Sequence, residues 1–195
     1  MATNFANIDL QKLEIGPIET GNNGGKYKRV SYNGDQLKNV QLGASVHSTL
    51  RCPYGVEAVS QDQPNKLCIK VDAPDDVKTF VEAIDNLVKN SVNDSSLVHR
   101  STLRLGAVGT TLKLKLQPDT QVFTATLKDN KLTTPKTGTF DDIKPNSQIL
   151  PIIKIQGGVY FIEENYGTSL VATQLLIVNR ETEPISFDLG CDIGD

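Results

Sequence analysis

The residues best suited to chemistry in this chain are cations and aromatic rings that share one short segment. The segment GNNGGKYKRVSYNG places Lys26, Lys28 and Arg29 beside Tyr27 and Tyr32. Cationic side chains can follow the phosphates of a nucleic-acid strand, and tyrosine rings can stack on unpaired bases. On a strand, Lys26 and Lys28 would point one way and Tyr27 and Arg29 the other. This surface is a candidate for single-stranded nucleic acid, and a hairpin with Tyr27 in the core and its lysines in water is the alternative.

A phosphate-binding loop is excluded at the same segment. The pattern G-x-x-x-x-G-K-[ST] would have to end at Gly25 and Lys26, which requires a glycine at position 20 and a hydroxyl residue at position 27. The sequence has Thr20 and Tyr27 there. A helix should also follow, because its N-terminal amides hold the phosphates. An Asn-Gly hairpin signal follows instead, so nucleotide hydrolysis is not expected.

A second set of cations lies on a strand further along the chain. Leu112, Leu114 and Leu116 alternate with Lys113 and Lys115. This alternation is typical of a half-buried strand with leucines in the core and lysines on the open face. We expect Lys113 and Lys115 to extend the surface that contacts phosphate.

Groups that could act in catalysis or bind metal lack the partners that such chemistry needs. The carboxylate pairs fit a helix start, a turn and a turn between strands, without a neighbouring histidine or a second acidic motif at metal-ligand spacing. Three cysteines without close spacing predict reduced thiols rather than a disulfide framework or a zinc site. We therefore expect no enzyme activity, no catalytic residue, no metal and no cofactor. The residues considered are Asp75-Asp76, Asp141-Asp142, Glu163-Glu164, Cys52, Cys68 and Cys191.

The composition is that of a soluble globular chain. Of its 195 residues, 38% are hydrophobic and 22% are charged, which is enough apolar content for a core. The opening MATNFANIDL has no apolar signal-peptide core. The longest apolar runs, ILPII and LLIV, are too short to span a bilayer. We expect a protein of the cytosol, the nucleus or a viral particle, with no membrane partner.

The net charge of −3 is unevenly distributed along the sequence. Residues 181–195 carry five acids and no base, which leaves 18 acids against 20 bases in residues 1–180. The pattern predicts one domain over residues 1–180, followed by an acidic C-terminal tail. Such a tail can compete with nucleic acid for a basic surface, and an ordinary solvated terminus is the alternative.

The pattern of elements places these side chains on a β-rich scaffold with one main helix. An early proline, acids near the helix start and an apolar stripe from Val77 to Val88 predict a helix over about residues 75–92. About nine or ten strands surround it in the sequence, with predicted hairpin turns at Asn33-Gly34 and Gly157-Gly158. We expect an α+β, β-rich fold, an antiparallel OB-like barrel or sandwich that leaves few strand edges exposed. The predicted strands include residues 27–32, 37–42, 56–59, 67–71, 112–116, 122–127, 149–155, 159–162 and 170–178.

Several motifs, taken in order, resemble a family of small proteins from large DNA viruses of algae and protists. They are NNGGKYKRVSYNG, CPYGVEA, STLRLG and the closing IKIQGGVYFIEENYGTSLVATQLLIV, which together cover most of residues 9–179. The resemblance implies an OB-fold-like protein that binds single-stranded DNA. By position it points to Gly25, Lys26, Tyr32, Asn33, Gly34, Gly158, Tyr160, Phe161, Tyr166, Gly167, Ser169 and Gln174.

The aromatic residues of the closing motif receive roles from this resemblance. Tyr160 and Tyr166 are implied stacking platforms, whereas Phe161 is expected to face the core. Unlike many members of that family, this chain has no tryptophan. That difference keeps open the alternative of a structural virion protein, a minor capsid or scaffold component that binds other capsid proteins.

The sequence thus predicts a non-enzymatic protein of a large DNA virus that binds single-stranded DNA, or RNA, without strong sequence preference. It would act in replication or recombination, in the cytoplasm or nucleus of the host cell, in a virus factory, or in the virion. Viral replication or capsid proteins and further copies of the chain are the other expected partners. The predicted nucleic-acid-binding residues are Lys26, Tyr27, Lys28, Arg29, Tyr32, Lys113, Lys115, Tyr160 and Tyr166.

Overall fold

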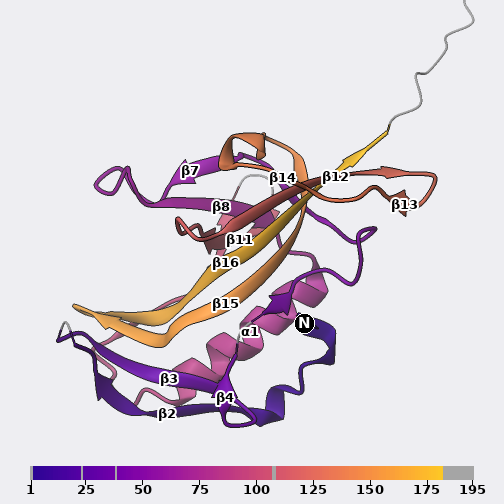
Figure 1. Cartoon of the computed structure of the whole chain (residues 1–195). Coiled ribbons are helices and arrows are strands. Elements are labelled where there is room, and N and C mark those ends of the chain that lie inside the picture. The colour runs from indigo at the N-terminus through magenta and orange to yellow at the C-terminus, as the bar shows by residue number, and fades with distance from the viewer. Residues whose placement is uncertain (1, 23, 38, 107–108, 182–195) are drawn as a thin grey trace, which may run out of the picture.

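The computed structural model describes residues 2–22, 24–37, 39–106 and 109–181 (Figure 1). The described residues form sixteen strands, one α-helix and three short 3₁₀ helices. The strands are β1 (Thr3–Asn4), β2 (Leu13–Thr20), β3 (Lys26–Tyr32), β4 (Asp35–Gln36), β5 (Val40–Gln41), β6 (Leu50–Cys52), β7 (Val56–Ala58), β8 (Leu67–Asp72), β9 (Val98–Arg100), β10 (Leu103–Gly106), β11 (Gly109–Lys115), β12 (Gln121–Lys128), β13 (Lys131–Leu132), β14 (Lys136–Thr137), β15 (Ser147–Ile162) and β16 (Asn165–Arg180). The helices are α1 (Asp75–Asn90) and the 3₁₀ helices Phe5–Asn7, Leu10–Lys12 and Phe140–Asp142.

A long hairpin of β15 and β16 forms the centre of the sheet (Figure 1). Its turn lies at Glu163-Glu164, where Glu163 has a φ of 52°. The expected turn at Gly157-Gly158 is wrong, because β15 runs through both residues and bulges there. A Cβ at Gly158 would collide with the backbone carbonyl of Lys28 on the neighbouring strand. The glycine therefore serves the close approach of two backbones rather than a change of chain direction.

The other strands add to the two sides of this hairpin. On one side β15 pairs antiparallel with β3, β5 and β6. On the other side β16 pairs parallel with β9, β11 and β12. Beyond β11 the sheet continues through β10 and β8, both antiparallel to it, and ends at β7.

The expected α+β, β-rich class is confirmed, but two details of the expected sheet are wrong. There are more strands than the nine or ten expected, because two-residue strands such as β4, β5 and β13 are too short to show an alternating pattern. The sheet is also mixed rather than antiparallel, since β16 has three parallel neighbours. Among the described strands, the order runs from β1 to β7 and the two ends do not pair, so the sheet is open.

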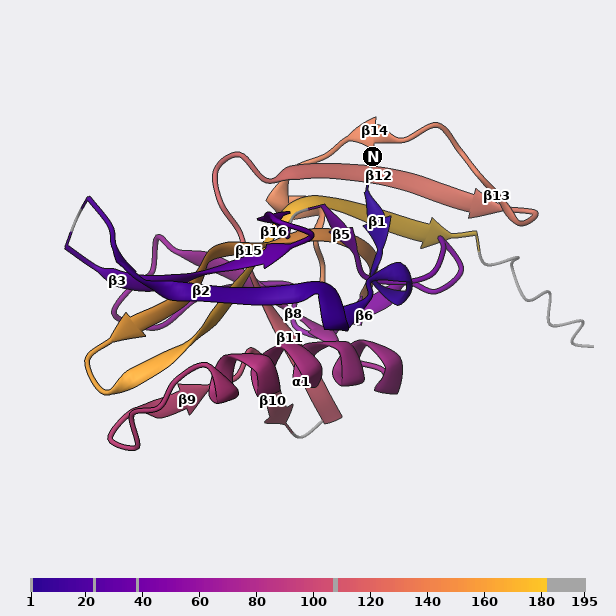
Figure 2. The same ribbon diagram turned by 90° about the horizontal axis from the view of Figure 1, so that it is seen from below.

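The one α-helix of the described ranges forms where the apolar stripe predicts it. Val77, Phe80, Val81 and Ile84 are buried, and α1 ends at Asn90, close to the expected end. Figure 2 shows α1 on one face of the β15–β16 hairpin, beside β9 and β10. This helix and the inward side chains of the sheet form the core, so the chemistry of the open face is left to the side chains that point away from α1.

Two predicted hairpin features are confirmed by the backbone. Asn33 and Gly34 have φ values of 52° and 82° between the paired strands β3 and β4, as a two-residue turn of this type requires. Strands β7 and β8 lie within the strands predicted over residues 56–59 and about 67–71, and they pair antiparallel. The returning strand expected over residues 37–42 is reduced to β5.

No helix in the described part of the chain is long and apolar enough to cross a membrane. Of the predicted tail, only Glu181 lies within the described ranges, where its carboxylate is 3.0 Å from the Lys128 amine. Residues 182–195, with the remaining acids and Cys191, lie outside the described residues. Cys52 and Cys68 are buried and unpaired with each other, as free thiols.

Candidate nucleic-acid interface

Four strands bring two tyrosines and an arginine into one row on the open face of the sheet. Tyr27 of β3 is the partner of Tyr160 on β15, Tyr160 is the partner of Gly167 on β16, and Gly167 is the partner of Arg100 on β9. Directly paired residues of neighbouring strands point to the same face of a sheet. Tyr27, Tyr160 and Arg100 therefore share one face, with a glycine in the gap between the last two.

Gly167 is what lets the ring of Tyr160 lie across β16. A Cβ at this position would lie 3.3 Å from the Tyr160 hydroxyl oxygen and would collide with the Arg100 carbonyl. Any side chain here would occupy the space over which Tyr160 extends toward β9. Of the pair Tyr166-Gly167, it is therefore the glycine that shapes the open face.

The opposite face of the same strands points toward α1 and corrects two expected roles. Tyr166 is only 6% exposed, and its ring packs against those of His99 and Phe161, at centroid distances of 5.3 Å and 6.2 Å. A ring buried in this way cannot stack on a base. The amine of Lys28 donates a hydrogen bond to the carbonyl of Ser91, at the end of α1. Lys28 therefore stabilises the helix C-terminus, where a cation is favourable.

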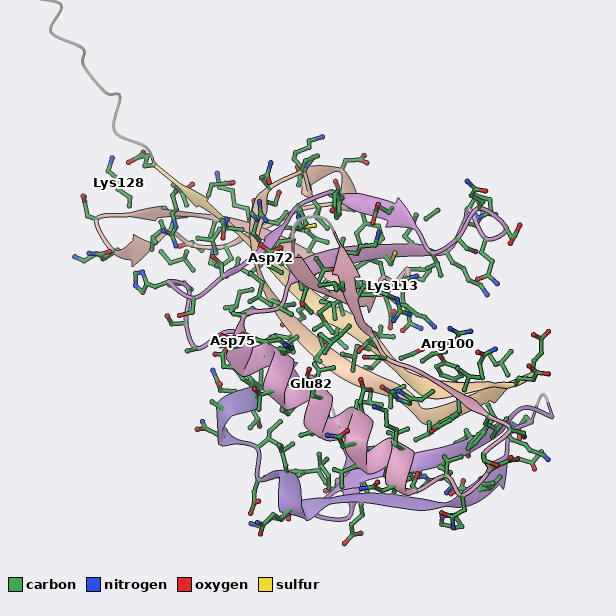
Figure 3. The ribbon with its side chains drawn as sticks, turned by 180° about the vertical axis from the view of Figure 1, so that it is seen from behind. Asp72, Asp75, Glu82, Arg100, Lys113 and Lys128 are labelled. Atoms are coloured by element: carbon green, nitrogen blue, oxygen red, sulfur yellow. The ribbon has the colours of Figure 1, made fainter. Side chains whose placement is uncertain are left out.

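Four cations surround a small hollow next to Tyr160, which we call the cationic hollow. Its volume is about 110 Å³. Figure 3 shows Arg100 and Lys113 on the same side of the molecule, far from Lys128. The side chains come from β9, β10, β11, β15 and β16 and the segment between β9 and β10. The lining residues are Arg100, Ser101, Thr102, Arg104, Lys113, Lys115, Tyr160, Thr168, Ser169 and Leu170.

The cations of this hollow are held by neutral acceptors. The Arg100 Nε donates to the Asn165 side-chain oxygen at 2.6 Å, and the Lys113 amine donates to the Val59 carbonyl at 3.0 Å. The Lys115 amine donates to the Ser169 hydroxyl at 2.8 Å. Arg104 donates to backbone carbonyls, including that of Leu103 at 2.9 Å.

No described carboxylate forms an ion pair with any of these four cations. Two other cations differ, since Arg29 lies 3.2 Å from a Glu19 carboxylate oxygen and Lys70 lies 2.9 Å from one of Glu57. The cationic hollow therefore concentrates positive charge that the surrounding protein does not neutralise. A bound anion would neutralise it.

Burial among these cations shifts the pKa values of two side chains of the cationic hollow. Burial lowers the pKa of Lys115, and the nearby charges of Lys113 and Lys66 lower it further. Burial raises the pKa of Tyr160, against the opposing influence of Arg104 and Arg100. Tyr160 is thus neutral at physiological pH, and its ring lies within the field of two guanidinium groups.

In the segment of residues 26–32, which the sequence analysis singled out, several side chains are held by other groups of the protein. Tyr27 donates to Glu19 at 2.8 Å, and Arg29 is paired with the same carboxylate. The Tyr32 hydroxyl accepts a hydrogen bond from the Asp9 amide at 3.4 Å, and the ring packs on the core. Lys26 is exposed at the start of β3. Of this segment, Tyr27 is the residue that the sheet register places directly beside Tyr160.

Sequence reasoning missed the two arginines of the cationic hollow and one tyrosine. Arg100 and Arg104 belong to β9 and β10, and only the sheet pairing brings them next to Lys113. The available signal was two arginines four residues apart around the hydroxyl residues Ser101 and Thr102. Tyr54, between β6 and β7, is 42% exposed, and the amine of Lys70 on β8 lies 5.3 Å from its ring centre.

A second and larger hollow adjoins the first at Lys115, and we call it the apolar hollow. Its volume is about 430 Å³. Apolar side chains from the β7–β8 region, from the end of β11 and from the tip of β15 form most of it. The lining residues are Val59, Gln63, Asn65, Lys66, Leu67, Lys115, Leu116, Gln117, Pro118 and Ile162.

No protein-family model matches the chain, and no curated protein sequence matches it. Two solved structures of partly similar outline are both of the single-stranded DNA-binding protein from bacteriophage Enc34. A C-terminal truncation of that protein is 13% identical with a TM-score of 0.43, over 88% of this chain and 97% of that chain. The second structure is 12% identical with a TM-score of 0.40, over 90% and 95%. Scores this low do not establish a shared fold, and these comparisons do not support the large-DNA-virus family that the motifs suggested.

Proposed function

We propose that this protein binds single-stranded nucleic acid on the open face of its sheet, without strong sequence preference. The observation that carries the proposal is the cationic hollow, where four cations without a carboxylate partner surround one side of Tyr160. Arg100, Arg104, Lys113 and Lys115 would contact phosphates. Tyr160, with Tyr27 beside it, would stack on bases.

The combination of cations and rings favours a single strand over a duplex. A base can stack on Tyr160 only when its face is free, whereas the bases of a duplex are stacked on each other. The cations recognise phosphate, which every nucleotide carries. Binding of this kind is strong at low salt and tolerant of sequence.

The biological setting is part of the same proposal. A non-enzymatic role in replication or recombination of a DNA virus, inside the host cell, would use such binding. The acidic residues after Arg180 would compete with nucleic acid for the cationic hollow or recruit other viral proteins. This part rests on the charge of the sequence, because residues 182–195 lie outside the described ranges.

The direct test is fluorescence anisotropy of a labelled oligothymidine over a series of salt concentrations. For single strands, log K should fall with log salt by about 0.7 for each phosphate contact. Changing both Lys113→Gln and Lys115→Gln should lower the slope by about 1.4. The control Lys78→Gln, on the exposed side of α1, should leave the slope unchanged. Absence of binding at low salt would overturn the proposal.

A structural virion protein is the second candidate. A hollow of about 290 Å³ favours it, because Phe123, Leu150, Ile152 and Leu176 give that hollow an apolar lining suited to a protein partner. Such a protein would co-purify with virus particles and would bind oligothymidine without a steep salt dependence. The anisotropy experiment therefore separates the two candidates.

A further inference from the structure

Two hollows of different chemistry meet at Lys115 on the candidate interface. On one side of this residue lies the small cationic hollow, and on the other side lies the larger apolar hollow. Lys115 lines both, and its amine faces the cationic side through its hydrogen bond to Ser169. A nucleotide has the same two-part construction, with an anionic phosphate at one end and a flat, largely apolar base at the other.

The apolar hollow has the surface that a base requires. Leu67, Leu116 and Pro118 line it, and Ile162 adds an apolar side chain that is 61% exposed in the free protein. Covering such an exposed aliphatic side chain with a ligand is favourable, because it removes apolar surface from water. The phosphate of that ligand would meet Lys115, and Lys66 adds a second positive charge at the rim.

Three amide side chains complete the lining, from Gln63, Asn65 and Gln117. Each amide carries both hydrogen-bond donors and an acceptor. The edge of a nucleobase also carries both kinds of group. The amides can therefore pair with the edge of a base whose faces lie against the apolar side chains.

We propose that the apolar hollow binds one base of the strand, unstacked from its neighbours, while the phosphate of the same nucleotide lies at Lys115 in the cationic hollow. The inference rests on the proposed function and deepens it, because it names one nucleotide subsite within the groove. A base inside a duplex is paired and stacked, and it cannot enter this hollow. The subsite thus adds to the selectivity for single strands that Tyr160 provides.

Small ligands test the subsite directly on the full-length protein. Isothermal titration would compare thymidine 5′-monophosphate, deoxyribose 5-phosphate and inorganic phosphate at low salt. The first should bind about tenfold more tightly than the second, since tenfold corresponds to about 1.4 kcal/mol. That is the contribution of roughly 55 Å² of buried apolar surface. Deoxyribose 5-phosphate and inorganic phosphate should bind similarly.

Substitutions test whether the tighter binding of the nucleotide arises in the apolar hollow. Ile162→Asn should remove most of the tenfold advantage of the nucleotide and leave deoxyribose 5-phosphate binding unchanged. Ile18→Asn is the matched control, because Ile18 is a comparably exposed isoleucine on β2, outside the hollow. Lys115→Met should weaken all three ligands.

The outcomes separate the two proposals. Equal affinity for the nucleotide and the sugar phosphate, together with salt-sensitive oligothymidine binding, would overturn the base subsite and leave the proposed function intact. An advantage for the nucleotide that survives Ile162→Asn would also overturn the assignment to this hollow. Failure of oligothymidine to bind at low salt would overturn both.

Discussion

At the scale of single residues, the interface depends on which face each side chain takes. Tyr160 and Tyr166 are six residues apart and occur in one motif, yet one ring is on the open face and the other is buried against His99. The hairpin turn between them and the register of β15 with β16 decide this difference. Of these two rings, only that of Tyr160 is therefore expected to stack on a base.

Replacing Tyr160 tests that expectation. Tyr160→Ala should weaken oligothymidine binding by about 1–3 kcal/mol, which is the usual contribution of one base–aromatic stack. Tyr160→Phe keeps the ring, so its binding free energy should lie within about a few tenths of a kcal/mol of that of the unchanged protein. Anisotropy titrations at one salt concentration measure both. A loss of equal size in the two variants would assign the role to the hydroxyl and contradict stacking.

The lowered pKa of Lys115 predicts a pH dependence of binding. Only protonated Lys115 attracts phosphate, and a bound phosphate raises its pKa back toward the ordinary value of 10.5. Affinity should therefore be constant below the pKa of the free protein and fall as the pH rises through it, below the range of ordinary lysines. Titrations across alkaline pH measure this fall. Lys115→Met should abolish the fall in affinity that begins at the lowest pH. A pH profile that Lys115→Met leaves unchanged would contradict the assignment of this fall to Lys115.

At the scale of elements, the helix and the cationic hollow are joined by one buried carboxylate. Asp85 of α1 is 4% exposed. One carboxylate oxygen accepts a hydrogen bond from the Ser101 hydroxyl at 2.5 Å, and the other lies 3.5 Å from the Nε2 of His99. These residues flank Arg100 in the sequence. Asp85 thus positions the segment that carries the arginine side of the interface.

Removing this carboxylate should affect stability and binding together. Asp85→Ala leaves the half-buried Ser101 hydroxyl without its acceptor, which costs about 1 kcal/mol in unfolding free energy. Arg100 loses its fixed position, so oligothymidine binding should weaken as well. Urea unfolding and anisotropy measure the two effects.

Glu82→Ala on the same helix is the control for Asp85→Ala. Its carboxylate is 3.9 Å from the amine of Lys78, at the surface, and Figure 3 shows Glu82 on α1. Its loss should change stability by less than about 0.5 kcal/mol. Binding that is intact in folded Asp85→Ala protein would argue against the positioning role.

Some features of these elements were predictable from patterns in the sequence, and others were not. The stripe of α1 and the alternation of β11 were predictable, because burial on one face leaves a period in the sequence. The lysine face of β11 was confirmed, with Leu112 and Leu114 fully buried. The place of Arg100 beside Lys113 was not predictable, since it arises from pairing between strands distant in the sequence. Gly158 was taken for a turn because a close backbone approach and a turn select the same residue.

At the scale of the whole molecule, a net charge of −3 coexists with a surface suited to an anion. Four cations that form no ion pair with a described carboxylate lie together at the cationic hollow, while others, such as Arg29 and Lys128, are neutralised by nearby acids. A strand of nucleic acid responds to this local charge rather than to the sum. The formal charge of the chain alone would not have suggested the anionic partner that we propose.

Truncation at Arg180 tests the contribution of the acidic residues to this balance. It removes five carboxylates and no base. If the tail competes for the cationic hollow, the truncated protein should bind oligothymidine more tightly at low salt, and the difference should shrink as salt screens the charges. Anisotropy with both proteins measures the effect. Equal affinities at every salt concentration would make the tail an ordinary solvated terminus.

The position of the β15–β16 hairpin in the chain has a consequence for synthesis. Strands β3, β5, β6, β9, β11 and β12 all pair with this hairpin, and all of them precede it. On the ribosome they emerge first and have unpaired edges until the last strand leaves the exit tunnel. Their pairing with β15 and β16 therefore has to wait for the synthesis of the hairpin, and pairings this distant in sequence slow folding. Until then, the strand edges that will meet the hairpin are free to pair with other chains.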